Sequence, residues 1–80
     1  MGIKEAAVLR IRELCEQNKI KFNTLANESG LTPSTVYSVL DEKRKDIGIL
    51  VLKKICDGLN ITITEFFDTD LFRNLEQEIK

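Results

Sequence analysis

The sequence contains no histidine and only two cysteines. Histidine is the side chain used most often as a general base, as the activator of a nucleophile and as a zinc ligand. Cys15 and Cys56 each fall where a helical pattern places a small apolar residue, so we expect two reduced, buried thiols and not a metal site. The sequence therefore predicts a protein that is not an enzyme and that takes no metal, cofactor or small-molecule ligand.

Long hydrophobic stretches are also missing. No segment approaches the roughly 18 to 20 consecutive apolar residues that a membrane-spanning helix needs. Residues 1–5 lack the apolar stretch and the cleavage signal of a secretory peptide. With 80 residues, of which 42% are hydrophobic and 31% charged, the chain has enough apolar residues for one compact domain. We expect a single folded domain in the cytoplasm, with no membrane partner.

The net charge of -1 argues by itself against a nucleic-acid partner, because counterion release rewards a basic surface. The charges are unevenly distributed, however. Residues 1–56 carry ten Lys and Arg against seven Asp and Glu, a net charge of +3, whereas residues 57–80 carry two against six, a net charge of -4. A basic body followed by an acidic end leaves a nucleic-acid-binding surface available.

Apolar residues recur at helical spacing along most of the chain. The expected helices span residues 4–17, 23–29, 33–40 and 49–59, with a short fifth helix that begins after Thr62 or Thr64 and places Ile63, Phe66 and Phe67 in the core. Asn23 is in position to cap the second helix, and Thr32 followed by Pro33 is typical of a helix start. The sequence predicts an all-α fold.

Two glycines are expected to mark helix ends. Gly30 follows the second helix, where a left-handed residue reverses the chain, and residues 58–60 are expected to end the fourth helix. Residues 68–80 carry only a weak apolar stripe, formed by Leu71, Phe72, Leu75 and Ile79. This stripe is typical of a marginal helix, of a dimerisation surface or of a tail that becomes ordered on a partner.

The most informative segment is residues 22–40, in which two short helices meet at a tight turn. Such helices cross steeply only if a small residue lies at the crossing, a glycine reverses the chain and apolar side chains fill the wedge. Ala26 and Gly30 meet the first two requirements, and Leu25, Leu31, Val36 and Val39 meet the third. This geometry projects the start of the third helix outward, and an α-helix fits the DNA major groove.

Residues 8–67 resemble the Cro and phage-repressor type of helix-turn-helix domain, also called the xenobiotic-response-element-like or XRE family. The resemblance lies in L-A-x-x-S-G-L-T-x-S-T-V from Leu25, in L-x-x-I-C-x-G-L-N-I from Leu52 and in T-x-x-E-F-F from Thr62. It implies a compact five-helix, lambda-repressor-like DNA-binding domain over residues 1–67. An acidic C-terminal tail, helical or dimerising, would follow over residues 68–80.

The resemblance also implies which residues meet double-stranded DNA. Base edges would be contacted by Pro33, Ser34, Tyr37 and Ser38, with Thr35 beside them, and phosphates by Lys21, Asn23, Thr24, Lys43, Arg44 and Lys45. No Arg, Asn or Gln stands among the base-contacting residues, so we expect limited direct readout or a contribution from DNA shape. Family members often carry Ser or Thr and then Gln where this chain has Lys21 and Phe22, so Phe22 is expected to pack inward and the second helix to start at Asn23.

We therefore predict a sequence-specific transcriptional regulator, acting as a repressor, that inserts its third helix into the major groove. A homodimer is one arrangement that the tail stripe allows, and it would match paired half-sites one helical turn apart. Two alternatives remain open. One is a DNA-binding protein of the antitoxin or restriction-controller type, in which the acidic tail engages a protein partner. The other is a protein-interaction module that has kept the helical scaffold without DNA affinity.

Overall fold

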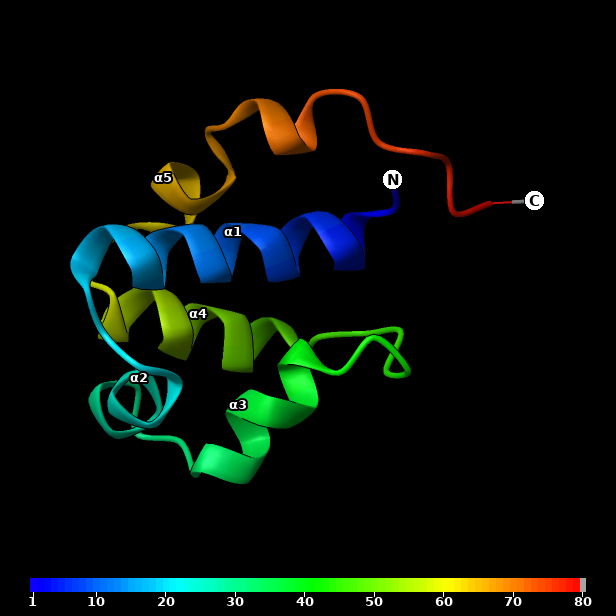
Figure 1. Ribbon diagram of the computed structural model, residues 1–80. Helices are drawn as coiled ribbons and strands as arrows, with labels where there is room; N and C mark the ends of the chain where they lie inside the picture. Colours follow the sequence, from blue (N-terminus) through cyan, green and yellow to red (C-terminus); the bar gives the residue numbers. More distant parts are fainter. Residues whose placement is uncertain (80) are drawn as a thin grey trace.

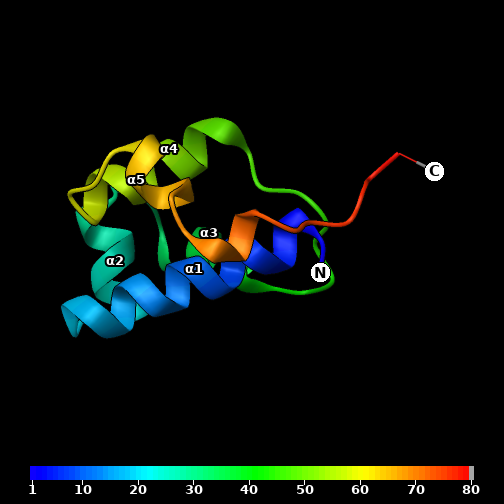
Figure 2. The ribbon, with the colours of Figure 1, turned by 90° about the horizontal axis from the view of Figure 1, so that it is seen from above.

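The computed structural model describes residues 1–79, and within them the regular structure is entirely helical (Figure 1). The elements are α1 (Ile3–Asn18), α2 (Phe22–Glu28), α3 (Pro33–Leu40), α4 (Ile49–Gly58), α5 (Ile63–Phe67) and a single 3-10 turn, η1 (Asp70–Phe72). In Figure 1, α4 lies below α1, and α2 and α3 lie below both, whereas the view from above in Figure 2 shows α2 and α3 between α1 and α4. The predicted all-α fold of five helices is confirmed.

α1 is one residue longer at each end than the sequence predicts. It ends at Asn18, whose side-chain amide donates to the Leu14 carbonyl over 2.8 Å, and Lys19 then adopts the left-handed conformation with φ 55°. Arg10 connects the middle of α1 to α5. Its guanidinium donates hydrogen bonds to the backbone carbonyls of Glu65, over 2.9 Å, and Phe66, over 2.8 Å. These bonds fix α5 across the centre of α1.

The start of α2 differs from the prediction. α2 begins at Phe22, with Lys21 as an N-cap that makes no side-chain capping bond, so Asn23 lies inside the first turn and is not the cap. The physical reason is the packing of the Phe22 ring, which is half-buried against the core. Phe22 reaches this position as the first residue of the helix. The expectation that Phe22 packs inward is confirmed, whereas a helix start at Asn23 is wrong.

The turn between α2 and α3 follows the sequence closely. Gly30 has φ +67°, a conformation that glycine adopts without a Cβ clash, and the Leu31 N–H donates to the Ala26 carbonyl over 2.9 Å. Thr32 caps α3 by accepting a 3.3 Å hydrogen bond from the Thr35 N–H, and Pro33 is the first helical residue. Both predictions for this turn are confirmed.

Gly58 has a packing role that the sequence does not suggest. α4 ends at Gly58, one residue before the predicted end. The left-handed residue that follows this helix is Asn60, with φ 59°, and not Gly58. Gly58 is needed for close packing instead. A Cβ built on it would lie 3.0 Å from the Ser29 nitrogen and 3.1 Å from the Glu28 carbonyl carbon, with the Ser29 hydroxyl oxygen nearer still. The end of α4 is thus pressed against the end of α2.

α5 begins with a complete capping box. The Thr62 hydroxyl accepts from the Glu65 N–H over 3.0 Å, and the Glu65 carboxylate accepts from the Thr62 N–H over 3.0 Å. Of the two caps that the sequence allows, Thr62 is therefore the correct one and Thr64 is not.

Replacing Thr62 with alanine is expected to lower the free energy of unfolding by about 1 kcal/mol, because it removes this cap from a helix of only five residues. Urea denaturation followed by circular dichroism measures the change. Thr64→Ala is the matched control, since Thr64 is exposed and caps nothing. Equal stability of the two variants would contradict the role given to the capping box.

The tail is attached to the body by aromatic packing. Phe66 is fully buried, Phe67 and Phe72 lie against it with ring centroids 5.0 Å and 5.9 Å away, and η1 packs on α1. Beyond η1 the chain runs alongside α1 back to the N-terminus (Figure 2), where the Glu76 N–H donates to the Met1 carbonyl over 3.1 Å. Regular helix in the tail is limited to this one turn within the described residues.

Cys15 and Cys56 are free thiols in the core, as predicted. Burial raises the pKa of both thiols, because removal from water disfavours the charged thiolate. Both sulfurs therefore stay protonated at neutral pH and pack as small apolar groups.

Candidate nucleic-acid interface

α2 and α3 form one rigid unit because their inner faces share the core. Leu25 and Ala26 of α2 and Val36 of α3 are fully buried, and Val39 is nearly so. The turn at Gly30 leaves only four residues between the two helices. The orientation of α3 relative to the body is therefore fixed by packing and does not depend on a flexible loop.

The opposite face of α3 is polar and open to solvent. Pro33, Ser34 and Ser38 are exposed, and 52% of the Tyr37 surface is accessible. Thr35 is only half-exposed, and its hydroxyl already has a hydrogen-bond partner in the Thr32 hydroxyl, 2.9 Å away. The structure thus brings all five residues predicted to contact bases onto the first two turns of one helix, with Thr35 the least available of them.

Cations lie on both sides of this face. Lys21 precedes α2, and the side chains of Asn23 and Thr24 are exposed on its first turn. Lys43, Arg44 and Lys45 are exposed in the loop that follows α3, and none of these three or Lys21 forms an ion pair within residues 1–79. All six residues predicted to contact phosphates therefore have side chains available to a ligand.

Asp41 shapes the cationic loop. Its carboxylate accepts from the Lys43 N–H over 2.9 Å, and its backbone carbonyl accepts from the Arg44 N–H over 3.0 Å and from the Lys4 ammonium over 3.0 Å. The first of these is an Asx turn, which holds the loop in a defined conformation. The three cations are thus presented from an ordered turn that is tied to α1.

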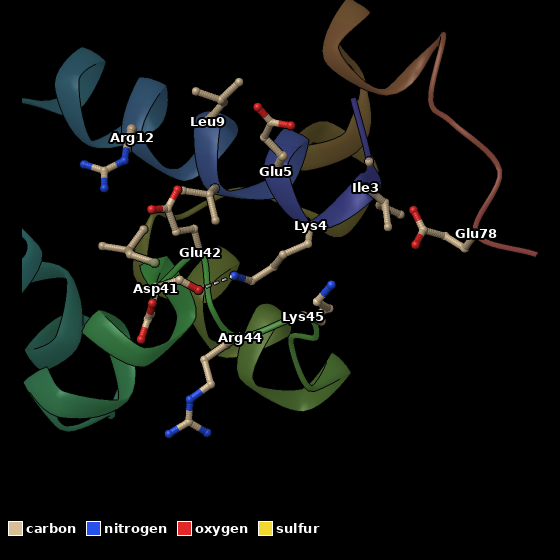
Figure 3. A pocket seen from close by; sticks show the side chains of 13 residues that line it. Ile3, Lys4, Glu5, Leu9, Arg12, Asp41, Glu42, Arg44, Lys45 and Glu78 are labelled. Carbon is tan, nitrogen blue, oxygen red and sulfur yellow. Dashed lines mark hydrogen bonds between the residues drawn. The ribbon is translucent and has the colours of Figure 1, made fainter.

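An open hollow of about 850 Å³ lies between the start of α1 and this loop (Figure 3). Its charged lining balances four cations, Lys4, Arg12, Arg44 and Lys45, against four anions, Glu5, Asp41, Glu42 and Glu78. Figure 3 shows the Arg44 side chain extending away from α1, whereas Glu42 lies on the α1 side of the loop. The Arg44 guanidinium is thus directed away from the body, and the Glu42 carboxylate lies behind it.

Arg12 and Phe22 were not identified as site residues from the sequence, but they lie beside this surface. The Arg12 guanidinium carbon is 5.3 Å from the centre of the Phe22 ring, and the Phe22 and Tyr37 rings meet edge to face with centroids 6.1 Å apart. The one signal in the sequence was the aromatic residue at the start of the second helix. Nothing in the spacing of α1 points to Arg12.

Two short helices held at a fixed angle, an outward polar face and flanking cations that are free of ion pairs are the features of a helix-turn-helix DNA-binding domain. The chain belongs to the family of Cro/C1-type helix-turn-helix DNA-binding domains, whose family model matches residues 10–70. The resemblance noted from the sequence is confirmed, and the chain is a DNA-binding regulator of this type.

The chain is also similar to a solved structure, described as the crystal structure of the prophage Lp1 protein 11. The two share 28% sequence identity with a TM-score of 0.81, over 94% of this chain and 100% of the other. No curated protein matches the chain. Among residues 1–79, no helix has the length and apolar character needed to cross a membrane.

Proposed function

We propose that this protein is a sequence-specific transcriptional repressor that acts in the cytoplasm by placing α3 in the major groove of double-stranded DNA. The observation that carries the proposal is the two-sided character of α3, with Val36 fully buried and Tyr37 half-exposed on adjacent positions. A helix anchored in this way presents one rigid polar face to base edges. Binding is the whole activity proposed, with no catalysis, cofactor or small-molecule ligand.

In this proposal the residues divide into two roles. Base edges are contacted by Pro33, Ser34, Thr35, Tyr37 and Ser38, and phosphates by Lys21, Asn23, Thr24, Lys43, Arg44 and Lys45. Serine hydroxyls bond to any base, and Pro33 offers only apolar contact, so direct readout is weak and DNA shape contributes to specificity. Repression follows from occupancy alone, because a domain bound across a promoter excludes other proteins from the same DNA.

We also propose that two copies bind a paired site as a homodimer. The apolar stripe of the tail is largely used within the chain, since Phe72 packs on Phe66 and Leu75 is half-buried. A contact close to the DNA is supported by Ile49 and Leu50 at the start of α4, which are 83% and 65% exposed directly after the cationic loop. The mass of the complex with DNA, measured by sedimentation, tests this stoichiometry.

A regulator of the antitoxin or restriction-controller type is the second candidate. We divide the chain for this purpose into the DNA-binding domain, residues 1–67, and the acidic tail, residues 68–80. The observation that favours a protein partner is the exposure of the tail, in which the side chain of Asp70 is 97% accessible and Ile79 is 88% exposed. Removal of residues 76–80 would leave DNA binding intact and abolish capture of the partner.

Selection of bound duplexes from random-sequence DNA at two salt concentrations tests the leading proposal. The wild-type protein is expected to enrich one site, and Ser34→Ala or Ser38→Ala is expected to reduce the preference for that site over a scrambled duplex by about 1 kcal/mol, or roughly fivefold. Thr64→Ala is the matched control, because Thr64 is an exposed hydroxyl on α5. Absence of both an enriched site and salt-dependent binding would reject a DNA-binding function.

A further inference from the structure

Three side chains from three helices contact one another in a row at the edge of the proposed interface. Arg12 of α1 lies over the ring of Phe22 of α2, with its guanidinium carbon 5.3 Å from the ring centre. The Phe22 ring in turn meets the ring of Tyr37 of α3 at an angle of 88°, with centroids 6.1 Å apart. The row therefore ends at Tyr37, a residue that we propose to contact the bases.

Arg12 differs from two other arginines in having no polar partner. Arg10 donates to two backbone carbonyls and pairs with Glu13, and Arg73 pairs with Asp68 and Asp70. Within residues 1–79 Arg12 is exposed and forms neither an ion pair nor a hydrogen bond. Its guanidinium is held by the ring face alone, so its N–H donors remain free for an anion.

The place of Arg12 favours a DNA phosphate as that anion. Phe22, on which Arg12 rests, directly follows Lys21, one of the residues that we assign to phosphate. Figure 3 shows the Arg12 side chain extending from α1 on the side where α2 and α3 lie. A guanidinium that lies over an aromatic ring keeps its N–H donors available, and a guanidinium binds a phosphate through two parallel hydrogen bonds.

Phe22 is suited to hold both neighbours in place. It is half-buried against the core, so its ring has a defined position, and it contacts the cation on its face and Tyr37 with its plane nearly perpendicular. Cations favour the electron-rich face of an aromatic ring, and aromatic pairs favour the edge-to-face arrangement. The orientation of Tyr37 is thereby linked to a residue that belongs to the body of the domain.

We propose that Arg12 is an additional phosphate-binding residue of the interface and that Phe22 is a positioning residue that orients Arg12 and Tyr37 toward the same duplex. The proposal rests on the DNA-binding function given above. It adds α1 to a surface that sequence reasoning had confined to α2, α3 and the loop after α3.

The first test is Arg12→Gln, with Arg73→Gln as a control that removes the same charge from a residue paired within the tail. Affinity is measured for the selected duplex and for a scrambled duplex between 50 and 200 mM salt. Loss of one phosphate contact is expected to reduce the slope of log affinity against log salt by about 0.9 on both duplexes. Arg73→Gln is expected to leave the slope unchanged, and equal slopes for the two variants would overturn the role of Arg12.

The second test is Phe22→Leu, which keeps an apolar side chain in the core but removes the ring. The effect of Arg12→Gln is expected to shrink or vanish in the Phe22→Leu background, and the preference for the selected duplex is expected to fall. Tyr37 is the sole tyrosine and the chain has no tryptophan, so intrinsic fluorescence reports on Tyr37 alone. Phe22→Leu should alter this signal without DNA, whereas Phe67→Leu on α5 should not.

The outcomes separate this inference from the function on which it rests. Additive effects of Arg12→Gln and Phe22→Leu, or an unchanged Tyr37 signal in a folded Phe22→Leu protein, would overturn the positioning role of Phe22. A wild-type protein that binds neither duplex would overturn the proposed function and the role of Arg12 together. A wild-type protein that binds normally while Arg12→Gln matches Arg73→Gln would overturn the role of Arg12 alone.

Discussion

Replacing Gly58 with alanine is expected to lower the free energy of unfolding by about 2 to 3 kcal/mol, because the added methyl group has no room. Its carbon would lie 3.0 Å from the Ser29 nitrogen and 3.1 Å from the Glu28 carbonyl carbon, and these backbone atoms move only if α2 and α4 separate. Because α2 carries α3, the same shift would disturb the DNA-binding unit. Urea denaturation measures the loss of stability.

The chain offers a matched control for this substitution. At Gly48, the nearest heavy atom to an added Cβ is Cγ2 of Val51, at the ordinary contact distance of 3.9 Å. Gly48→Ala should therefore cost only the preference for glycine over alanine at the N-cap of α4, which is clearly less than the cost of Gly58→Ala. Combining Gly58→Ala with Ser29→Ala removes the hydroxyl but not the backbone contacts, and should recover only part of the stability. Equal stability of the Gly58→Ala and Gly48→Ala proteins would show that α2 and α4 are not in close contact.

Removing the charges of Lys43, Arg44 and Lys45 together, by substitution with glutamine, is expected to have the largest effect on DNA affinity. Each phosphate contact contributes about 0.9 to the slope of log affinity against log salt, so loss of three contacts should lower the slope by about 2.7. Raising the salt from 50 to 200 mM weakens binding of both proteins, and this loss of affinity should be about 40-fold smaller for the variant than for the wild-type protein. Fluorescence anisotropy with a labelled duplex measures both affinities.

The control for this variant removes the same number of cations elsewhere. Lys53 pairs with Asp57 on α4, Lys54 is its neighbour, and Arg73 pairs with Asp68 and Asp70 in the tail. Glutamine at these three positions changes the net charge equally, so it reproduces any effect of overall charge. If both triple variants lost affinity to the same extent, the loop would have no special role and the long-range field of the protein would explain the binding.

Local signals in the sequence were sufficient for the turn that positions α3. Gly30, Thr32 and Pro33 act through their own backbone and their immediate neighbours, so their effects can be recognised from the order of residues alone. Residues 58–60 do end α4 as predicted, but the packing role of Gly58 was missed because it depends on Ser29, which lies at the end of another helix, 29 positions earlier in the chain. The fold was predictable where conformation is local, and it was not where close packing between distant segments decides.

The same distinction applies to the candidate site. The exposed face of α3 follows from helical periodicity, since burying Val36 and Val39 turns Tyr37 and Ser38 outward. The start of α2 was misplaced because Asn23 is a good capping residue by propensity, but burial of the Phe22 ring outweighs that preference. Arg12 was missed because its distance from Phe22 is set by the packing of α1 on α2, which no sequence spacing specifies.

The two buried cysteines make this domain convenient for site-directed chemical labelling. Thiol reagents attack the thiolate, and Cys15 and Cys56 are both inaccessible and have raised pKa values, so they give a low background. A cysteine introduced at Ser38 would then be the most reactive thiol of the folded protein. A cleavage reagent attached there would cut the bound duplex next to α3, and the positions of the cuts would map its path along the groove.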